Sequence, residues 1–198
     1  MAAPPLVLAS TSRYRRELLQ RLRCPFDVVA PEVDESPLPG ERPPDLALRL
    51  ALAKARAVAA LRPDSIIIGS DQVADADGQA IGKPGNHARA VAQLQTMRGR
   101  QVLFHTAVAV VHRAAGFERC ELVSVTVRFR HLGDDEIESY LRLEQPYDCA
   151  GSAKCETLGI ALLESIDSDD PTALVGLPLI RTSALLRAAG FNPVHHAT

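Results

Sequence analysis

Three arginines follow a short apolar run near the start of the chain. The segment contains Leu6–Ala9, the hydroxyl run Ser10–Ser12, and then Arg13, Arg15 and Arg16. A strand that passes through such a turn into a helix exposes unpaired backbone N–H groups at the positive end of the helix dipole. Arginine binds phosphate oxygens bidentately. The pattern predicts an anion site in which Ser10, Arg15 and Arg16 bind phosphate. The alternative is a capped helix with solvated arginines, although cations in a first turn oppose the dipole.

Two lysines could join this anion site. Lys54 stands in the alanine-rich stretch Asp45–Leu61, which predicts a helix, and Lys83 stands in the rigid turn Gly82-Lys83-Pro84. Either residue alone would more often be a surface lysine. Their assignment to phosphate binding therefore depends on the fold bringing them to the arginines.

Carboxylates supply the complementary chemistry. Asp71 ends the apolar stretch Ser65–Asp71, and α/β proteins often place sites at the ends of strands. A carboxylate there could bind a divalent metal or act as a general base, whereas an Asx turn or a helix cap is the alternative. Glu35 lies in the proline-rich acidic loop Ala30–Asp45 and could share a metal with Asp71, unless the loop is merely solvated.

Composition excludes several classes of protein. The chain has 198 residues and a formal net charge of -2, which argues against a general nucleic-acid or membrane-surface binder. No apolar run approaches the roughly 18 residues of a membrane span. The motifs of P-loop enzymes, Rossmann dinucleotide sites, serine-hydrolase elbows and HExxH metalloenzymes are absent. We therefore expect no membrane partner and no stable nucleic-acid partner.

The spacing of apolar residues predicts an α/β fold, with a mixed twisted sheet flanked by helices. We expect residues 1–198 to form a single domain with two closely joined lobes. The hairpin from Gln101 to Arg130 should extend the sheet or form the second lobe, and Asp77-Gly78 should form a turn. His195-His196 at the tail should be a disordered end. The predicted strands are 6–9, 26–29, 65–71, 101–111 and 118–130, and the predicted helices are 13–22, 45–61, 87–97, 134–143 and 178–189.

Several ordered motifs resemble the Maf family of nucleotide pyrophosphatases. They span nearly the whole chain: LASTSRYRRELL, PEVDE, LALAKA, IIGSDQV, IGKP, DCAGSAKCETLG and LVGLP. The resemblance implies an elongated two-lobed architecture of the Maf and ITPase kind with a central cleft, and residence in the cytoplasm. It also implies metal-assisted hydrolysis of a nucleoside triphosphate to a monophosphate and pyrophosphate, with Mg²⁺, Mn²⁺ or Co²⁺ as cofactor.

The resemblance also implies roles for individual residues. Asp71 would be the proton acceptor that activates water, and Glu35 would share metal binding with it. The triphosphate would be held by Ser10, Arg15, Lys54 and Lys83, with Arg16 as a weaker candidate. One position departs from the family pattern. Arg13 stands where the family usually has proline, so it either reaches phosphate or faces solvent.

Three positions bear on the choice of nucleotide. Tyr14, Gln72 and Glu156 resemble the branch of the family that acts on 7-methyl-GTP. The N7-methylated guanine is cationic, so it should stack on the Tyr14 ring, and the Glu156 carboxylate can accept hydrogen bonds from guanine. Alternatively, Tyr14 packs against a loop and Glu156 is exposed.

Other functions stay open at this stage. The substrate could be another canonical or modified nucleotide, such as dTTP or UTP. The protein could also be a non-catalytic regulator of cell division that binds a nucleotide or nucleic acid. The set of Arg15, Lys54, Asp71 and Lys83 favours an enzyme, because a pure binder needs no base beside the phosphates. The expected partner is a small-molecule nucleotide, and a homodimer is possible.

Overall fold

One seven-stranded sheet forms the centre of the computed structural model, which describes residues 3–197. The strand order is β2-β1-β3-β5-β6-β7, and β4 pairs with β3 beside this path. β1 pairs in parallel with β2 and β3, while the remaining pairs are antiparallel, so the sheet is mixed as predicted. The strands are β1 Leu6–Ala9, β2 Asp27–Val29, β3 Ile66–Ala76, β4 Gln79–Ile81, β5 Gln101–His112, β6 Phe117–Phe129 and β7 Leu163–Asp167.

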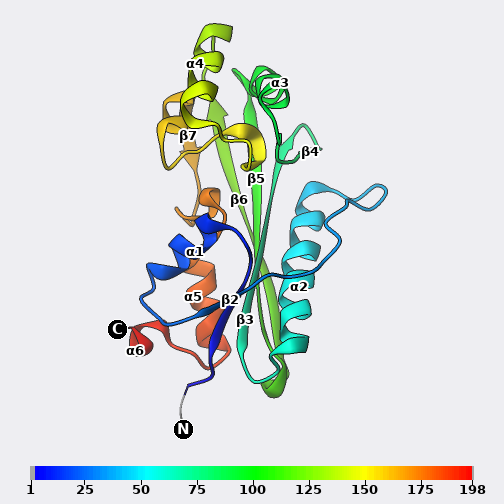
Figure 1. The fold of residues 1–198 in the computed structure, drawn as a ribbon, viewed down its shortest axis with the longest axis vertical. Helices are drawn as coiled ribbons and strands as arrows, with labels where there is room; N and C mark the ends of the chain where they lie inside the picture. The colour runs from blue at the N-terminus through cyan, green and yellow to red at the C-terminus, as the bar shows by residue number, and fades with distance from the viewer. Residues whose placement is uncertain (1–2, 198) are drawn as a thin grey trace.

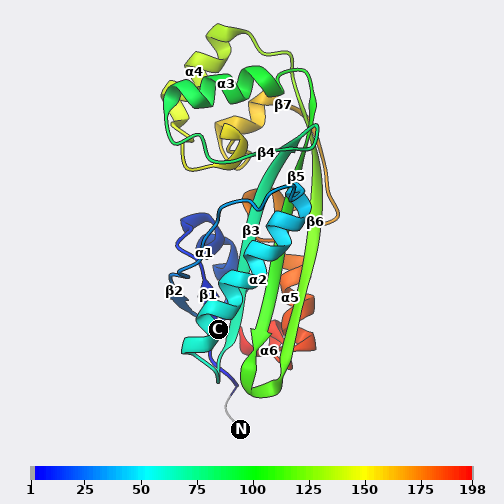
Figure 2. The ribbon, with the colours of Figure 1, turned by 90° about the vertical axis from the view of Figure 1, so that its right-hand side faces the viewer.

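Helices cover both faces of the sheet and give the molecule an elongated shape (Figures 1 and 2). At one end, α2 covers one face, and α1, α5 and α6 lie on the other. At the other end, α3 and α4 lie near β7 and β4, while β3, β5 and β6 extend between the ends. The helices are α1 Arg13–Gln20, α2 Pro43–Leu61, α3 His87–Met97, α4 Asp134–Glu144, α5 Leu179–Ala188 and α6 Pro193–His196.

Local sequence explains where the site-bearing elements begin and turn. Ser12 caps α1 as expected, and its side chain accepts a hydrogen bond from the backbone of Arg15. α2 begins at Pro43, slightly earlier than predicted, because proline is well tolerated in a first turn. The β3–β4 hairpin turns at Asp77 and Gly78, which both have the positive φ values of a tight two-residue turn.

A close contact between α2 and β3 sets the position of the helix. A Cβ atom built at Gly69 would overlap the backbone oxygen of Ala51 and would lie 2.7 Å from the backbone nitrogen of Ala55. The helix backbone therefore rests directly on the strand. Lys54, between these two alanines in the sequence, is thereby held next to the sheet.

The prediction that Asp71 ends its strand is wrong. β3 continues to Ala76, because β5 pairs with it from Ile67 to Asp75. The parallel partner β1 does stop, however, and its last residue Ala9 pairs with Gly69. Asp71 thus lies two residues beyond the end of the parallel pairing, where the edge of β3 is open to a ligand.

His195 and His196 do not form a disordered end: they belong to α6, and the ring of His196 packs on Phe191 with centroids 4.4 Å apart. The buried Phe191 thus holds the C-terminal helix in place, a contact that the sequence pattern did not reveal.

Within residues 3–197, no helix is both long and apolar enough to cross a membrane.

Replacing Gly69 by alanine should destabilise the protein by about 1–3 kcal/mol, the usual range for an overpacked core. The added methyl group would meet helix backbone rather than a flexible side chain, so α2 must move. Urea unfolding measures the loss. Gly82→Ala is the matched control, because a Cβ there meets nothing within 4 Å; equal stabilities for the two variants would contradict the prediction.

Candidate active site

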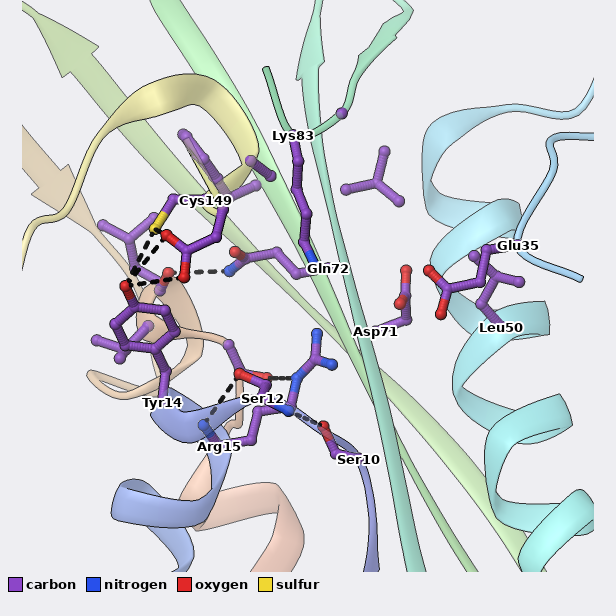
Figure 3. A pocket seen from close by; sticks show the side chains of 18 of the residues that line it. Ser10, Ser12, Tyr14, Arg15, Glu35, Leu50, Asp71, Gln72, Lys83 and Cys149 are labelled. Carbon is purple, nitrogen blue, oxygen red and sulfur yellow. Dashed lines mark hydrogen bonds between the residues drawn. The ribbon is translucent and has the colours of Figure 1, made fainter. Parts of the chain in front are cut away.

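A cleft of about 620 Å³ lies beside the open edge of β3. Its walls come from the N-terminus of α1, the middle of α2, the β3–β4 hairpin and the segments 148–156 and 174–176. Figure 3 shows side chains from these elements pointing into the same space. Segments far apart in sequence therefore form one binding site. The predicted site residues that line it are Ser10, Tyr14, Arg15, Glu35, Lys54, Asp71, Gln72, Lys83 and Glu156.

Lys54 joins the two carboxylates at the centre of the cleft. Its Nζ donates a hydrogen bond of 2.6 Å to Asp71 Oδ1 and forms an ion pair of 2.8 Å with Glu35 Oε1. The side chains of Lys54 and Asp71 are only 6% and 10% exposed, whereas that of Glu35 is 58% exposed. The inner pair is therefore poorly screened by water, and removing either partner would leave a costly buried charge.

The surrounding cations hold Glu35 in its charged form. Burial alone would raise the pKa of Glu35. The hydrogen bond from Lys54, together with the positive charges of Lys54, Lys83 and Arg15, instead lowers that pKa below its ordinary value. Glu35 is therefore an anion at neutral pH, although it lies on an exposed loop.

Arg15 is held in place by the segment on the opposite wall. Its Nε donates to the backbone oxygen of Gly176 at 2.9 Å, and the hydroxyl of Ser70 donates to the same oxygen at 3.0 Å. Burial lowers the pKa of Arg15, while the negative charges of Asp71 and Glu35 oppose this shift. A guanidinium stays protonated even so, which makes Arg15 a fixed positive charge facing two carboxylates.

The turn before α1 also faces the cleft. Ser10 is buried, and its Oγ accepts a hydrogen bond of 3.1 Å from the backbone of Ser12. Its hydroxyl hydrogen remains able to donate to a ligand. Together with the positive end of the α1 dipole, this turn has the features of an anion-binding helix N-terminus.

Lys83 enters the cleft from the β3–β4 side, and Arg15 enters from the α1 side (Figure 3). Both point toward the region of Asp71, so the three charges share one space. Arg16, the weaker candidate, does not line this cleft. It lies on a separate pocket with Gln20 and Phe26, because consecutive positions on a helix face different directions.

Three predicted specificity residues lie at the side of the cleft away from α2. The Gln72 side-chain nitrogen donates to the backbone oxygens of Ala173 and Leu174, at 3.0 and 2.9 Å. The Tyr14 hydroxyl lies 3.4 Å from both carboxylate oxygens of Asp148. Glu156 is exposed and lines the cleft.

The structure gives Arg13 a role that its sequence position left open. Its guanidinium lies over the Tyr14 ring, 4.7 Å from the ring centroid, and donates a hydrogen bond of 2.7 Å to the Tyr14 hydroxyl. It also forms a long ion pair of 4.0 Å with Asp148. Arg13 therefore packs on the aromatic side chain at the rim and does not extend toward Asp71.

Sequence reasoning missed the residue that shapes the 170–176 wall. Asp170 is fully buried, and its Oδ2 accepts hydrogen bonds from the backbone of Ile180 and Arg181 in the first turn of α5. Its Oδ1 accepts from the backbone and hydroxyl of Thr172. No local signal marks Asp170, because a capping residue directly precedes its helix, whereas α5 begins only at Leu179.

A divalent metal fits the carboxylates, though not as a site made by protein alone. No cluster of three or more His, Cys, Asp or Glu suited to a metal is found within residues 3–197. Mg²⁺ is commonly held by one or two carboxylates together with substrate phosphates and water. Asp71 and Glu35, both within 3 Å of Lys54 Nζ, provide such a pair.

A cleft that combines three cations, a buried carboxylate and a helix N-terminus is typical of an enzyme that acts on a polyphosphate. The family model of Maf-like proteins matches residues 5–189. The chain therefore belongs to the Maf family.

Close relatives span almost the whole chain. A 7-methyl-GTP pyrophosphatase of Albidiferax ferrireducens is 68% identical over 187 residues, 94% of each chain. That of a Polaromonas species is 69% identical over 186 residues, covering 94% of this chain and 85% of its own. The 7-methyl-GTP pyrophosphatase of Burkholderia pseudomallei is 64% identical over 191 residues, which cover 95% of this chain and 89% of its own.

A solved structure of a HAM1 protein from Coxiella burnetii also aligns with this chain. The alignment has a TM-score of 0.43 and 13% identity, and it covers 66% of this chain and 75% of that protein. The likeness is too weak to compare the two clefts.

Replacing Asp170 by alanine should lower the free energy of unfolding by about 3 kcal/mol, because it removes a fully buried carboxylate that accepts hydrogen bonds from the N–H groups of Ile180 and Arg181 in the first turn of α5. Asp169→Ala is the matched control. That neighbour makes one exposed ion pair with Arg181, which is worth about 0–1 kcal/mol. Chemical denaturation of both variants gives the comparison, and a smaller loss in D170A than in D169A would refute the assignment.

Proposed function

We propose that the protein hydrolyses 7-methyl-GTP to 7-methyl-GMP and pyrophosphate. The observation that carries this proposal is the convergence of Arg15, Lys54 and Lys83 on the buried carboxylate of Asp71 in one cleft. The relatives named 7-methyl-GTP pyrophosphatase support the choice of substrate, since they are 64–69% identical over 94–95% of this chain. The protein is then a hydrolase of phosphorus anhydrides, and we expect it to act in the cytoplasm.

In this mechanism Asp71 accepts the proton of the attacking water. Lys54 binds its Oδ1, and no residue within 3–197 donates a hydrogen bond to Oδ2, so that oxygen is available to a water molecule. The hydrogen bond from Lys54 keeps the carboxylate oriented. A base held at fixed geometry beside the α-phosphorus favours in-line attack, with pyrophosphate as leaving group.

Positive charge stabilises the phosphates as negative charge moves onto the leaving group. Arg15 and Lys83 would bind the triphosphate from opposite walls, and Ser10 would donate from the turn before α1. Phosphoryl transfer depends mainly on such positioning and charge stabilisation. A divalent metal, when bound by Glu35 and Asp71, supplies further positive charge to the phosphate oxygens. Lys54 would then exchange part of its contact with the carboxylates for phosphate.

The rim residues would recognise the base. A methylated guanine carries a positive charge, and an aromatic face attracts a cation, so the proposed stacking partner is the face of the Tyr14 ring that Arg13 does not cover. Glu156 would accept hydrogen bonds from the guanine edge and offset the charge. Gln72, whose nitrogen is bound to backbone oxygens of the 170–176 wall, would present its side-chain oxygen from a fixed position.

Asp71→Asn should reduce turnover of 7-methyl-GTP by about 10²–10⁴-fold, the usual contribution of a general base. Nucleotide binding should be largely retained, because the amide keeps the shape of the side chain and can still accept a hydrogen bond from Lys54. Pyrophosphate release with Mg²⁺, Mn²⁺ or Co²⁺ measures the rate, and calorimetry measures the affinity. Near-normal turnover in D71N would exclude Asp71 as the base, and loss of binding would make it structural.

Glu156→Ala should reduce the preference for 7-methyl-GTP over GTP by about tenfold, the effect of one hydrogen bond to a charged group. Within the part of the chain that the structure describes, Glu156 is exposed and forms no hydrogen bond or ion pair with Lys54 or Asp71, so the rate with GTP should change much less. Asp148→Ala serves as a comparison, since it removes another rim carboxylate. An unchanged ratio of kcat/KM values in E156A would remove Glu156 from base recognition.

A further inference from the structure

A line of hydrogen-bonded polar side chains crosses the sheet outside the cleft, from the half-buried Asp75 through the buried His105 to the exposed Ser124. Asp75 on β3, His105 on β5 and Ser124 on β6 are joined by His105, whose Nε2 lies 3.2 Å from Asp75 Oδ2 and whose Nδ1 lies 2.8 Å from Ser124 Oγ. The side chains of His105 and Asp75 are only 7% and 11% exposed. None of the three lines the cleft. Buried polar groups cost stability unless they are paired, so this line needs an explanation.

The second oxygen of Asp75 explains its position. Asp75 Oδ1 accepts a hydrogen bond of 2.7 Å from the backbone N–H of Gly78, in the turn of the β3–β4 hairpin. One carboxylate thus binds the hairpin on one side and the centre of the sheet on the other. His105 holds the carboxylate in the rotamer that reaches the turn.

The hairpin matters because it leads directly to Lys83. β4 ends at Ile81, and Gly82 and Lys83 follow it toward the cleft. β4 pairs with β3 at only three positions, and residues 77–80 are exposed. Further contacts on this segment are a hydrogen bond of 3.0 Å from Gln93 to the backbone oxygen of Gly82, the packing of Ile81 against the core, and an exposed ion pair between Asp77 and Arg100. A three-residue edge strand is weak by itself. The hydrogen bond that Asp75 accepts from Gly78 therefore helps to hold the hairpin on the sheet.

We propose that Asp75, oriented by His105, is a positioning residue that holds the β3–β4 hairpin and so keeps Lys83 directed at the polyphosphate. This inference rests on the proposed function, because it assigns Asp75 an effect through Lys83. Asp75 touches neither substrate nor reacting atoms. Its loss should weaken binding of the phosphates and leave the chemistry at Asp71 nearly unchanged.

The experiment is a double-mutant cycle between Asp75→Ala and Lys83→Ala, read as KM and kcat for 7-methyl-GTP. Each single variant should raise KM about tenfold, the effect of one lost hydrogen bond to a charged group, and any fall in kcat in D75A should be no larger than the fall in K83A, because Asp75 acts only through Lys83. The double variant should be no worse than K83A alone, since Asp75 has nothing left to position.

Asp75→Asn separates hydrogen bonding from charge. Its amide oxygen can accept from Gly78, and its nitrogen can donate to His105 once the imidazole adopts its other tautomer, so D75N should restore the wild-type KM. Asp77→Asn is the matched control. It removes a carboxylate from the same turn that only makes an exposed pair with Arg100, and asparagine tolerates positive φ. D77N should behave as wild type.

Three outcomes would overturn the inference. They are an unchanged KM in D75A, a KM in the double variant that is raised by the product of the two single effects, and a KM in D75N as high as that in D75A. Failure of the proposed function looks different, because the wild-type protein itself would then release no pyrophosphate. The same cycle is then read as the affinity for inorganic tripolyphosphate by calorimetry. Multiplying losses of affinity, or none in D75A, would equally refute the positioning role.

Discussion

The contact between α2 and β3 at Gly69 sets the geometry on which the cleft depends. Without a side chain at this position, the backbone of Ala51 and Ala55 rests on the strand. Lys54 is then brought within 2.6 Å of Asp71, two residues along the same strand. A larger residue would separate the helix from the sheet and lengthen this pair. Packing, rather than electrostatic attraction alone, therefore places the central charges.

Electrostatics then determines which ligands the cleft attracts. The chain as a whole is slightly acidic, with a net charge of -2, yet the cleft gathers cations from α1, α2 and the β3–β4 hairpin. These cations face Asp71 and Glu35, and Lys54, Lys83 and Arg15 lower the pKa of Glu35. An incoming polyphosphate would replace carboxylate oxygens with phosphate oxygens around the same positive groups.

Two carboxylates outside the cleft support its walls in the same way, by accepting hydrogen bonds from backbone N–H groups. Asp170 accepts backbone N–H groups at the start of α5 and thereby supports the segment that includes Gly176, the anchor of Arg15. Asp75 accepts the N–H of Gly78 and supports the hairpin before Lys83. Each acid satisfies backbone groups in an irregular segment that no strand pairing would satisfy. These hydrogen bonds attach the segments before Lys83 and around Gly176 to the neighbouring strand and helix.

The sequence by itself determined the mixed α/β class, most helices and strands, and the residue types of the cleft. Apolar periodicity and turn residues such as Asp77-Gly78 are local signals, and local signals can be read along the chain. Tertiary structure decided that β3 passes beyond Asp71, because the residues of β5 that pair with it lie 28 or more positions away in sequence, as for Asp75 and Leu103. It also decided that Arg16 faces away from the cleft and that His196 packs on Phe191. The supporting roles of Asp170 and Asp75 were likewise hidden, since a hydrogen bond to a distant backbone group leaves no periodic pattern in the sequence.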